Sequence, residues 1–546
     1  MKIALAQLNY HIGNFEFNTK KIIDHIQQAK AAGADLVVFA ELAICGYPPR
    51  DFLEFDEFIE LCEQAAQEVA SHTQGIACIF GLPVKNELAA GKDLFNAAYF
   101  IEDGAVKAVV RKALLPNYDV FDEYRYFEPA MSFDCITYKG KKIALTICED
   151  LWNINNNPLY IHNPMDELIK QSPDLMINIA ASPFSYLHDD ERVEVLSRNA
   201  SQYGLPLLYV NQVGAQTEII FDGGSMAFNK EGVLIDELAY FKEDFKIYTF
   251  EENELKGLDA ITHQAIPDIA QIHDALILGI QDYFRKSGFQ KAVLGLSGGI
   301  DSAIVCALAC RALGPENVMA VLMPSKYSSD HSIRDALDLV QNIGCKHEII
   351  KISEAADAFD HILAPVFEGM AFNLTEENIQ ARCRGILLMA MSNKFGYILL
   401  NTSNKSECAV GYGTLYGDMC GAIGVIGDVY KTQIFQLARY INKDGDVIPE
   451  NTIVKPPSAE LRPDQKDSDS LPDYDTLDQI LMQYIEQKKS SRAIIAKGFD
   501  EALVKRVIKL VNNAEFKRYQ TPPILRVSPK AFGMGRRMPI VGKYLS

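Results

Sequence analysis

Short apolar runs alternate with longer amphipathic stretches through the first half of the chain. Runs of this length are typical of buried strands, and the stretches between them are long enough to form helices. The runs cover residues 2–8, 36–40, 76–82, 143–147, 175–180 and 207–210. This alternation predicts an α/β layer architecture for the first half.

The second half shows the same alternation with longer helical stretches. Residues 269–288 have helical apolar spacing, and residues 292–296 have the composition of a buried strand. Further strands are predicted at residues 318–323, 348–352 and 397–401. The stretches between them are long enough for right-handed crossovers, so we expect a doubly wound parallel sheet.

A polar stretch at residues 251–268 separates these two patterns, and we place the linker there. The predicted domains are therefore residues 1–250 and 269–546. Two domains are also expected from the length, because one hydrophobic core seldom keeps growing in a chain of 546 residues. Residues 455–474 are rich in Pro, Asp and Ser, so we expect a loop there, either a lid or a disordered stretch.

Composition limits the classes of function. The chain is 48% hydrophobic and 23% charged, as in an ordinary globular protein. A formal charge of −19 argues against nucleic acid as the main partner. No long apolar run or signal-peptide core is present, so we expect a cytoplasmic protein without a membrane partner. The 11 cysteines lack CxxC spacing, which favours reduced thiols over a disulfide or zinc framework.

The strongest motif lies between a predicted strand and the helix expected at residues 303–312. Its residues are Gly295, Leu296, Ser297, Gly298, Gly299, Ile300, Asp301 and Ser302. The glycines permit close backbone approach, and the serines place hydroxyls beside a helix N-terminus, where an anion is favoured. Because no Gly-Lys-Ser/Thr sequence closes the loop, it is not a Walker A motif.

This loop resembles the PP-loop of the ATP pyrophosphatases. In that family a nucleophile attacks the α-phosphorus of ATP and pyrophosphate leaves. The loop alone leaves open whether a nucleotide, an amino acid or a tRNA base is modified. Residues 375–384, 402–407, 416–418 and 431–432 together resemble the NAD synthetase domain, and the resemblance covers nearly all of residues 269–546.

The resemblance implies roles for individual residues. Thr402 and Lys431 would join the loop in binding ATP, and Lys431 has the charge to stabilise the transferred phosphorus. Asp301 and Glu407 would bind Mg²⁺, which prefers oxygen ligands. The positions that resemble contacts to deamido-NAD are Asn378, Arg384, Glu407, Asp418 and Lys517.

The first half carries three separated residues that suit amide hydrolysis, Glu41, Lys112 and Cys148. Their segments resemble the nitrilase superfamily, whose Glu-Lys-Cys triad cleaves carbon–nitrogen bonds within an α-β-β-α sandwich. A cysteine attacks as a thiolate and requires a base, which Glu41 would provide. Lys112 would stabilise the oxyanion and favour the thiolate.

A glutamine pocket is also implied by resemblance, at Tyr118, Glu149 and Ser182. His188 lies in the same pocket at a loop position where the family commonly carries a lysine. We expect polar contacts to glutamine from these four residues.

Together the two halves resemble the glutamine-dependent NAD synthetases. The expected reaction uses glutamine, ATP with Mg²⁺, and deamido-NAD, with ammonia channelled between the sites. Three alternatives stay open: a PP-loop amidotransferase acting on another acid, a binding or scaffold protein with degenerate sites, and a tRNA-modifying enzyme. Because the family forms symmetric assemblies, we also expect a homo-oligomer.

Overall fold

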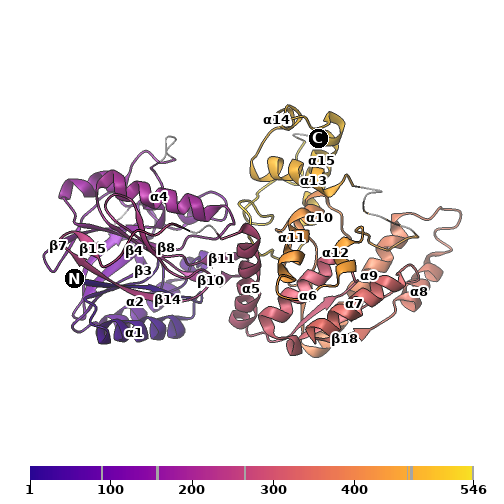
Figure 1. Cartoon of the computed structure of the whole chain (residues 1–546), viewed down its shortest axis with the longest axis horizontal. Coiled ribbons are helices and arrows are strands. Elements are labelled where there is room, and N and C mark those ends of the chain that lie inside the picture. The colour runs from indigo at the N-terminus through magenta and orange to yellow at the C-terminus, as the bar shows by residue number, and fades with distance from the viewer. Residues whose placement is uncertain are drawn as a thin grey trace. The chain divides into compact units, whose positions relative to one another are not determined.

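The computed structural model describes residues 1–87, 90–154, 159–263, 266–463, 465, 467 and 471–543. The chain divides into two compact units, Met1–Ile266 and Pro267–Ser546, and each has its own sheet system (Figure 1). Parts of the expected linker (264–265) and of the expected loop (464, 466 and 468–470) lie outside the described residues. The last residues of the expected second domain, 544–546, also lie outside them.

The first unit contains a seven-stranded sheet, a six-stranded sheet and a two-stranded ribbon. The seven-stranded sheet has the order β15-β14-β1-β2-β3-β4-β5, the six-stranded sheet β13-β12-β9-β8-β7-β6, and the ribbon β10-β11. The strands are β1 Lys2–Gln7, β2 Leu36–Val38, β3 Ala77–Lys85, β4 Leu94–Glu102, β5 Ala105–Arg111, β6 Ile136–Tyr138, β7 Lys141–Ile147, β8 Leu175–Ala180, β9 Leu207–Asn211, β10 Val213–Gln216, β11 Ile219–Asp222, β12 Met226–Phe228, β13 Leu234–Glu237, β14 Asp244–Glu251 and β15 Glu254–Lys256. The helices are α1 Phe15–Ala31, α2 Asp56–Ser71, α3 Pro164–Leu168 and α4 His188–Tyr203, with short 3₁₀ turns η1 Arg50–Glu54, η2 Glu123–Arg125, η3 Cys148–Leu151 and η4 Ile169–Gln171.

The alternation along β1 explains how the layers form. Ile3 and Leu5 belong to the core that both sheets share, whereas Ala4 and Ala6 belong to the core formed with α1 and α2. Because successive side chains of a strand point to opposite faces, this strand is buried on both sides. Figure 1 shows α1 and α4 on opposite sides of the strands. The predicted α-β-β-α sandwich is confirmed.

The sheet of the first unit continues beyond residue 251, where the polar pattern predicted the start of the linker. β14 continues to Glu251, and β15 pairs antiparallel with it through Glu254–Lys256. The first compact unit extends to Ile266. An edge strand of three residues with charged ends gives almost no hydrophobic signal, so residues 251–256 resemble a linker in sequence although they belong to a sheet.

The second unit is built on one five-stranded sheet with the order β18-β17-β16-β19-β20, and every neighbouring pair is parallel. Its elements are α5 Asp268–Ser287, β16 Ala292–Gly295, α6 Ile300–Leu313, η5 Pro315–Asn317, β17 Val318–Leu322, α7 Asp330–Ile343, β18 Lys346–Ile349, α8 Ser353–Leu363, α9 Leu374–Phe395, β19 Ile398–Asn401, α10 Lys405–Val410, β20 Ile423–Gly424, α11 Lys431–Ile441, α12 Glu450–Val454, α13 Tyr474–Leu481, the π-helical turn η7 Met482–Glu486, α14 Ser491–Ile495, α15 Glu501–Asn513 and α16 Glu515–Arg518. Because the chain starts at the central β16 and proceeds outward on both sides, the predicted doubly wound sheet is confirmed. Such sheets bind ligands where the direction reverses, here at the carboxyl ends of β16 and β19.

One strand of the second unit lies earlier than predicted. β18 covers Lys346–Ile349 and all four residues are exposed at the sheet edge. The apolar run expected to form it, residues 348–352, ends in the buried Ile352, which packs beyond the strand. The hydrophobic signal therefore marked the segment that follows the strand. Among the described residues, no helix has the length and apolar character needed to cross a membrane.

Candidate active sites

Ends of three strands bring together the three residues predicted in the first unit. Lys112 directly follows β5, Cys148 directly follows β7, and Glu41 lies three residues beyond β2. β2 and β5 belong to one sheet and β7 belongs to the other. Strand ends on rigid sheets hold side chains in fixed positions, as a catalytic group requires.

Glu41 and Lys112 form an ion pair inside the protein. The Lys112 Nζ donates to Glu41 Oε1 at 2.7 Å, and both side chains are at most 1% exposed. Asn96 Nδ2 donates to the same oxygen at 2.7 Å, and the backbone N–H of Ala181 donates to Glu41 Oε2 at 3.0 Å. With these donors around it, the Glu41 carboxylate is held in one orientation.

Glu123 is a further acid in this site that the sequence did not reveal. A carboxylate oxygen of Glu123 lies 2.9 Å from Lys112 Nζ, and Tyr47 and Asn96 also donate to this carboxylate. Burial raises the pKa of Glu123, although the charge of Lys112 opposes the rise. Lys112 is thus shared by two carboxylates. An isolated glutamate in a polar stretch carries no local motif, so only the fold identifies it.

Cys148 lies in a strained turn at the edge of the same site. It begins η3 with a φ of 45°, a conformation that non-glycine residues rarely adopt and that often marks functional sites. The Asp150 carboxylate holds this turn, because it accepts from the N–H groups of Ile147, Ala113 and Leu114 at 2.9–3.0 Å. The same acid thereby fixes the turn against the segment that follows Lys112.

The charges around Cys148 determine its protonation. Burial, followed by the nearby charge of Glu41, raises the pKa of the Cys148 thiol well above its usual range, and the opposing effect of Lys112 is smaller. Burial lowers the pKa of Lys112, but Glu123 and Glu41 outweigh burial and the net pKa is raised. The charge of Lys112 thus favours the thiolate, whereas burial and the charge of Glu41 favour the thiol. Attack requires a base, and Glu41 is the nearby carboxylate positioned by three donors.

The four residues predicted for glutamine fall into two pairs. Tyr118 donates its hydroxyl hydrogen bond to both oxygens of Glu149 at 2.9 and 3.1 Å, and Tyr160 adds a third bond at 3.1 Å. Ser182 Oγ lies 3.2 Å from His188 Nε2. Burial raises the pKa of Glu149 to about 7, against the lowering effects of Lys112 and the two tyrosines.

Trp152 links the two pairs in space. Its ring stacks on His188 with centroids 4.9 Å apart, and its backbone N–H donates to the carbonyl of Glu149 at 2.9 Å. Tyr160 and Trp152 were not predicted as members of this site, because aromatic residues in a loop carry no specific signal. His188 thus has both a stacking partner, Trp152, and a polar partner, Ser182.

The predicted phosphate loop of the second unit joins β16 to α6. Ser297 Oγ accepts from the Gly299 N–H at 3.2 Å and lies 3.2 Å from Ser302 Oγ. Gly298 has a φ of +84°, and a Cβ there would lie 2.1 Å from the Ser332 carbonyl oxygen. Only glycine fits this position without a shift of the backbone, so the loop conformation depends on Gly298.

Lys431, the first residue of α11, lies between two carboxylates, one of them from Asp301 at the start of α6. Lys431 Nζ is 2.5 Å from Asp301 Oδ2 and 3.9 Å from Glu407 Oε1. Asn404 connects the two acids, because its Nδ2 donates to Asp301 and its Oδ1 accepts from the Glu407 N–H, both at 2.9 Å. Burial, followed by the charge of Asp301, raises the pKa of Glu407 to about 8.

Thr402 reaches the same edge of the sheet by topology. It directly follows β19, which is the parallel neighbour of β16, so Thr402 and the phosphate loop both lie at carboxyl ends of adjacent strands. This is the reversal point of the doubly wound sheet, where ligands bind in such folds.

The remaining predicted residues surround the turn at residues 411–418. Thr414 Oγ1 donates to Asn378 at 2.8 Å, and the Thr414 N–H donates to Asp418 at 2.6 Å. Lys517 Nζ donates to the carbonyls of Gly411 and Gly413, both at 2.8 Å. Burial raises the pKa of Asp418 to about 6, against the opposing charges of Lys517 and Arg384. These residues, although distant in sequence, thus form one polar cluster.

Comparison with known proteins identifies the family. The carbon-nitrogen hydrolase family model matches residues 2–256, and the NAD synthase model matches residues 272–521. The chain is 47% identical to the glutamine-dependent NAD(+) synthetase of Synechocystis sp. over 98% of each protein, and 42% identical to that of Acinetobacter baylyi over 99% of this chain and 98% of the relative. This chain belongs to the glutamine-dependent NAD(+) synthetases.

A solved structure of this family matches the whole chain. It is the glutamine-dependent NAD(+) synthetase of Acinetobacter baumannii in complex with adenosine diphosphate, which is 40% identical, covers 99% of this chain and 98% of its own, and has a TM-score of 0.79. The glutamine-dependent NAD(+) synthetase of Cytophaga hutchinsonii, 22% identical over similar lengths, has a TM-score of 0.83 and shows the same fold. The chain is thus a ligase that uses glutamine, with a hydrolase domain before a synthase domain.

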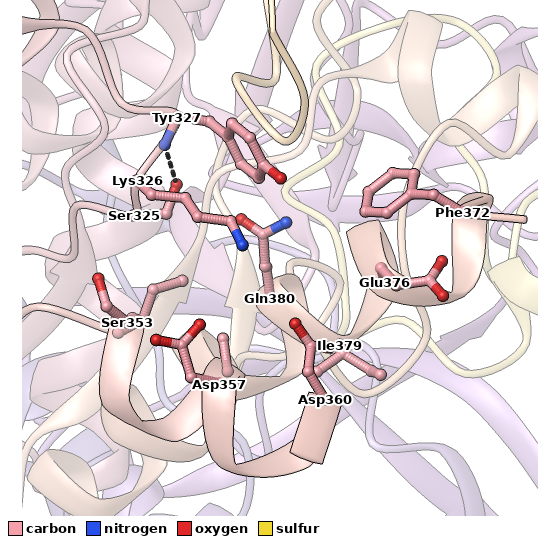
Figure 2. Close-up of a pocket in the computed structure, with 12 residues that line it drawn as sticks. Ser325, Lys326, Tyr327, Ser353, Asp357, Asp360, Phe372, Glu376, Ile379 and Gln380 are labelled. Carbon is pink, nitrogen blue, oxygen red and sulfur yellow. Dashed lines mark hydrogen bonds between the residues drawn. The ribbon is translucent and has the colours of Figure 1, made fainter. Parts of the chain in front are cut away.

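The synthase unit also has a surface pocket, and none of the predicted site residues belongs to its lining. Figure 2 shows it between the segment that follows β17 and the helices α8 and α9. Its charged lining consists of Asp357, Asp360 and Glu376 together with Lys326. Because acids outnumber the single cation, phosphates are better accommodated at the phosphate loop than in this pocket.

The Gly298→Ala variant tests the phosphate loop. The added Cβ would meet the Ser332 carbonyl, so the loop must move, and a displacement near 1 Å at a reacting group costs about a hundredfold in rate. We expect that loss in ammonia-dependent NAD⁺ synthesis, with weaker nucleotide binding by calorimetry and unchanged glutamine hydrolysis. Gly396→Ala is the matched control, because its φ is +68° but nothing lies within 4 Å of a Cβ there. Wild-type nucleotide affinity in Gly298→Ala would contradict the assignment.

Proposed function

We propose that this chain amidates deamido-NAD with ammonia that it releases from glutamine, and that ATP activates the carboxylate. The buried Glu41–Lys112 pair beside Cys148 is the observation that carries the first half-reaction. The serine-lined loop at the reversal point of the sheet supports the second. One assay tests the proposal as a whole: formation of NAD⁺, AMP, pyrophosphate and glutamate is measured with deamido-NAD as the substrate and compared with other carboxylates.

Glutamine hydrolysis begins with attack by Cys148. Glu41 accepts the thiol proton as the sulfur bonds to the side-chain amide carbon, and Lys112 stabilises the resulting oxyanion. Glu41 then returns the proton to the departing nitrogen, so the carbon–nitrogen bond breaks and ammonia leaves. Water hydrolyses the thioester at Cys148 and glutamate is released. The raised pKa of the Cys148 thiol supports this order, because deprotonation has to accompany attack.

Glu149 provides the selectivity for an amino acid. Glutamine carries an α-ammonium group as well as the amide, and an ionised carboxylate is the natural partner for it. Tyr118 and Tyr160 hold the Glu149 carboxylate through hydrogen bonds of 2.9–3.1 Å. Ser182 and His188 offer further polar contacts at the other end of the pocket.

The synthase unit performs two substitutions. The nicotinate carboxylate of deamido-NAD attacks the α-phosphorus of ATP and pyrophosphate leaves. Ammonia then attacks the carbonyl carbon of the adenylate, AMP leaves, and the amide of NAD⁺ forms. Ser297, Ser302 and the N–H groups of the phosphate loop suit the leaving pyrophosphate, while Thr402 and Lys431 complete the ATP site. Asn378, Arg384, Asp418 and Lys517 form the polar cluster that we assign to deamido-NAD.

The carboxylates of Asp301 and Glu407 fit a Mg²⁺ ion. Asp301 lies at the start of α6, directly after the phosphate loop, and Glu407 lies on α10; both are oxygen donors, and Asn404 contacts both residues. Burial, and after it the charge of Asp301, raises the pKa of Glu407 to about 8, so part of the rise comes from repulsion between the two acids. A divalent cation relieves such repulsion, prefers these ligands and neutralises phosphate charge when bound.

Ammonia transfer and assembly are further parts of the proposal. Free ammonia is mostly protonated at neutral pH and then lacks the lone pair needed for attack, so we propose that it is channelled from Cys148 to the synthase site. We also propose a homo-oligomer, because most soluble oligomers are symmetric assemblies of one chain. Isotope dilution of the transferred nitrogen and sedimentation of the full chain test these two points.

Replacement of the nucleophile separates the two half-reactions. In Cys148→Ala we expect glutamine-dependent synthesis to fall by about four orders of magnitude or more, the range seen when a covalent nucleophile is removed. Ammonia-dependent synthesis should persist, because the synthase unit is unchanged. Cys135→Ala is the control, since Cys135 is a half-buried thiol outside both sites. Equal loss of both activities in Cys148→Ala would argue against separate sites.

The pH dependence of glutamine use follows from Glu149. Its carboxyl pKa is raised to about 7, so the group is protonated below that pH and loses its attraction for the ammonium of glutamine. Glutaminase kcat/KM should therefore fall about tenfold per pH unit below about 7. Glu149→Gln should lower kcat/KM and remove this limb, whereas Glu194→Gln, on the exposed face of α4, should retain it. An unchanged limb in Glu149→Gln would exclude this role.

Loss of one carboxylate tests the magnesium site. In Asp301→Asn we expect the Mg²⁺ concentration for half-maximal ammonia-dependent synthesis to rise by at least the roughly 10- to 100-fold seen when groups that support a metal site are lost. The control is Asp338→Asn, an exposed acid on α7. A Mg²⁺ requirement that stays at the wild-type concentration in Asp301→Asn would place the ion elsewhere.

A further inference from the structure

Three cysteines of the second unit bring their sulfur atoms together outside both active sites. Cys306 and Cys310 lie one turn apart on α6, and Cys345 lies between the end of α7 and the start of β18. All three Sγ atoms are within 4.8 Å of one another, and Cys306 Sγ is 3.9 Å from Cys345 Sγ. Figure 1 places the labels of α6, α7 and β18 in the same region of this unit.

The separations match a shared metal ion better than a disulfide. A disulfide requires sulfur atoms about 2.0 Å apart. Three thiolates around one ion, each at about 2.3 Å, stand about 3.8–4.0 Å from one another, depending on whether the geometry is tetrahedral or trigonal. The 3.9 Å between Cys306 and Cys345 already has this value, and side-chain rotation of Cys310 adjusts the third sulfur.

The chemistry of the three side chains also suits a metal. The thiolate is the form of cysteine that binds metals, and each thiol supplies it by releasing its proton. Three sulfur atoms that face one another are a different environment from the aliphatic packing of an ordinary core cysteine.

The cluster is accessible from one side. Cys310 and Cys345 are 6% and 7% exposed, while Cys306 is fully buried. The group has no fourth His, Cys, Asp or Glu member in the part of the chain that the structure describes, so a fourth position is left for water or remains open. Soft sulfur ligands of this kind select d¹⁰ ions over Mg²⁺.

We propose that Cys306, Cys310 and Cys345 form a binding site for a thiophilic d¹⁰ metal ion, Zn²⁺ or Cu⁺. The ion replaces the thiol protons of all three cysteines, which pass to solvent, and joins the three sulfurs. The site lies apart from Asp301, which precedes Cys306 on α6 by five residues, about 7.5 Å along the helix. Metal binding thereby fixes the helix that begins at the phosphate loop against the start of β18.

Cadmium is the probe, because its bonds to thiolates absorb in the ultraviolet. Titration of the reduced full-length chain with Cd²⁺ should give one tight equivalent with a sulfur-to-cadmium band, and Zn²⁺ or Cu⁺ should displace it. In Cys310→Ser and Cys345→Ser the affinity should fall at least tenfold and the band should shrink, while Cys135→Ser should bind as wild type. Retained ammonia-dependent NAD⁺ synthesis shows that the unit holding the three cysteines is folded in each variant.

Alkylation of the unmodified protein gives a readout that needs no variant. In the native protein, one equivalent of Cd²⁺ should slow the alkylation of Cys310 and Cys345 by iodoacetamide, as mapped by mass spectrometry, and leave the rates at the half-buried Cys135 and Cys420 unchanged. Absence of the band, or protection of other cysteines in place of Cys310 and Cys345, would overturn the proposal. An undiminished band in both serine variants would do the same.

Discussion

The burial of one lysine charge between two carboxylates is the constraint on which the hydrolase site depends. An isolated buried ion costs several kcal/mol, so Lys112 is tolerated only because Glu41 and Glu123 lie 2.7 and 2.9 Å away. Asn96 donates to both carboxylates and so holds them beside the lysine. Burial, followed by the charge of Glu41, raises the pKa of the Cys148 thiol, which is why our proposal needs a carboxylate held at the site as its base.

The synthase site repeats this arrangement in a more open setting. Lys431 also lies between two acids, and Asn404 holds both of them as Asn96 does in the first unit. The side chains of Asp301 and Glu407 are 19% and 17% exposed, however, whereas Glu41 is 1% exposed. In our proposal the sealed triplet serves proton transfer, whereas the open one exchanges its lysine contact for a metal or a phosphate. The same charge pattern thus supports different chemistry according to its access to solvent.

The sequence predicted those candidate site residues that belong to a short contiguous motif. Cys148 and the loop around Ser297 follow clear strand signals, and their neighbours in sequence carry the resemblance to known families. Glu123 and Asn404 were not predicted as site residues, because each is important through a contact to a residue distant in the sequence. Glu123 contacts Lys112, and Asn404 contacts Asp301. The same reason explains β15, whose three residues have no pattern of their own and become a strand only by pairing with β14. Where a segment has no hydrophobic pattern of its own, tertiary contacts determine its structure.

Cysteine spacing shows how far such local reasoning can mislead. The absence of CxxC pairs argued for scattered reduced thiols, and all described cysteines are indeed unpaired. Yet two thiols one helical turn apart always share a face of their helix, and a parallel sheet returns the chain to that face after each crossover. Cys345 arrives there after β17 and α7, 35 residues beyond Cys310 in the sequence. The ligands of such a site have no fixed spacing in the sequence, because the topology of the sheet and not a single loop brings them together. Only the fold therefore reveals the site.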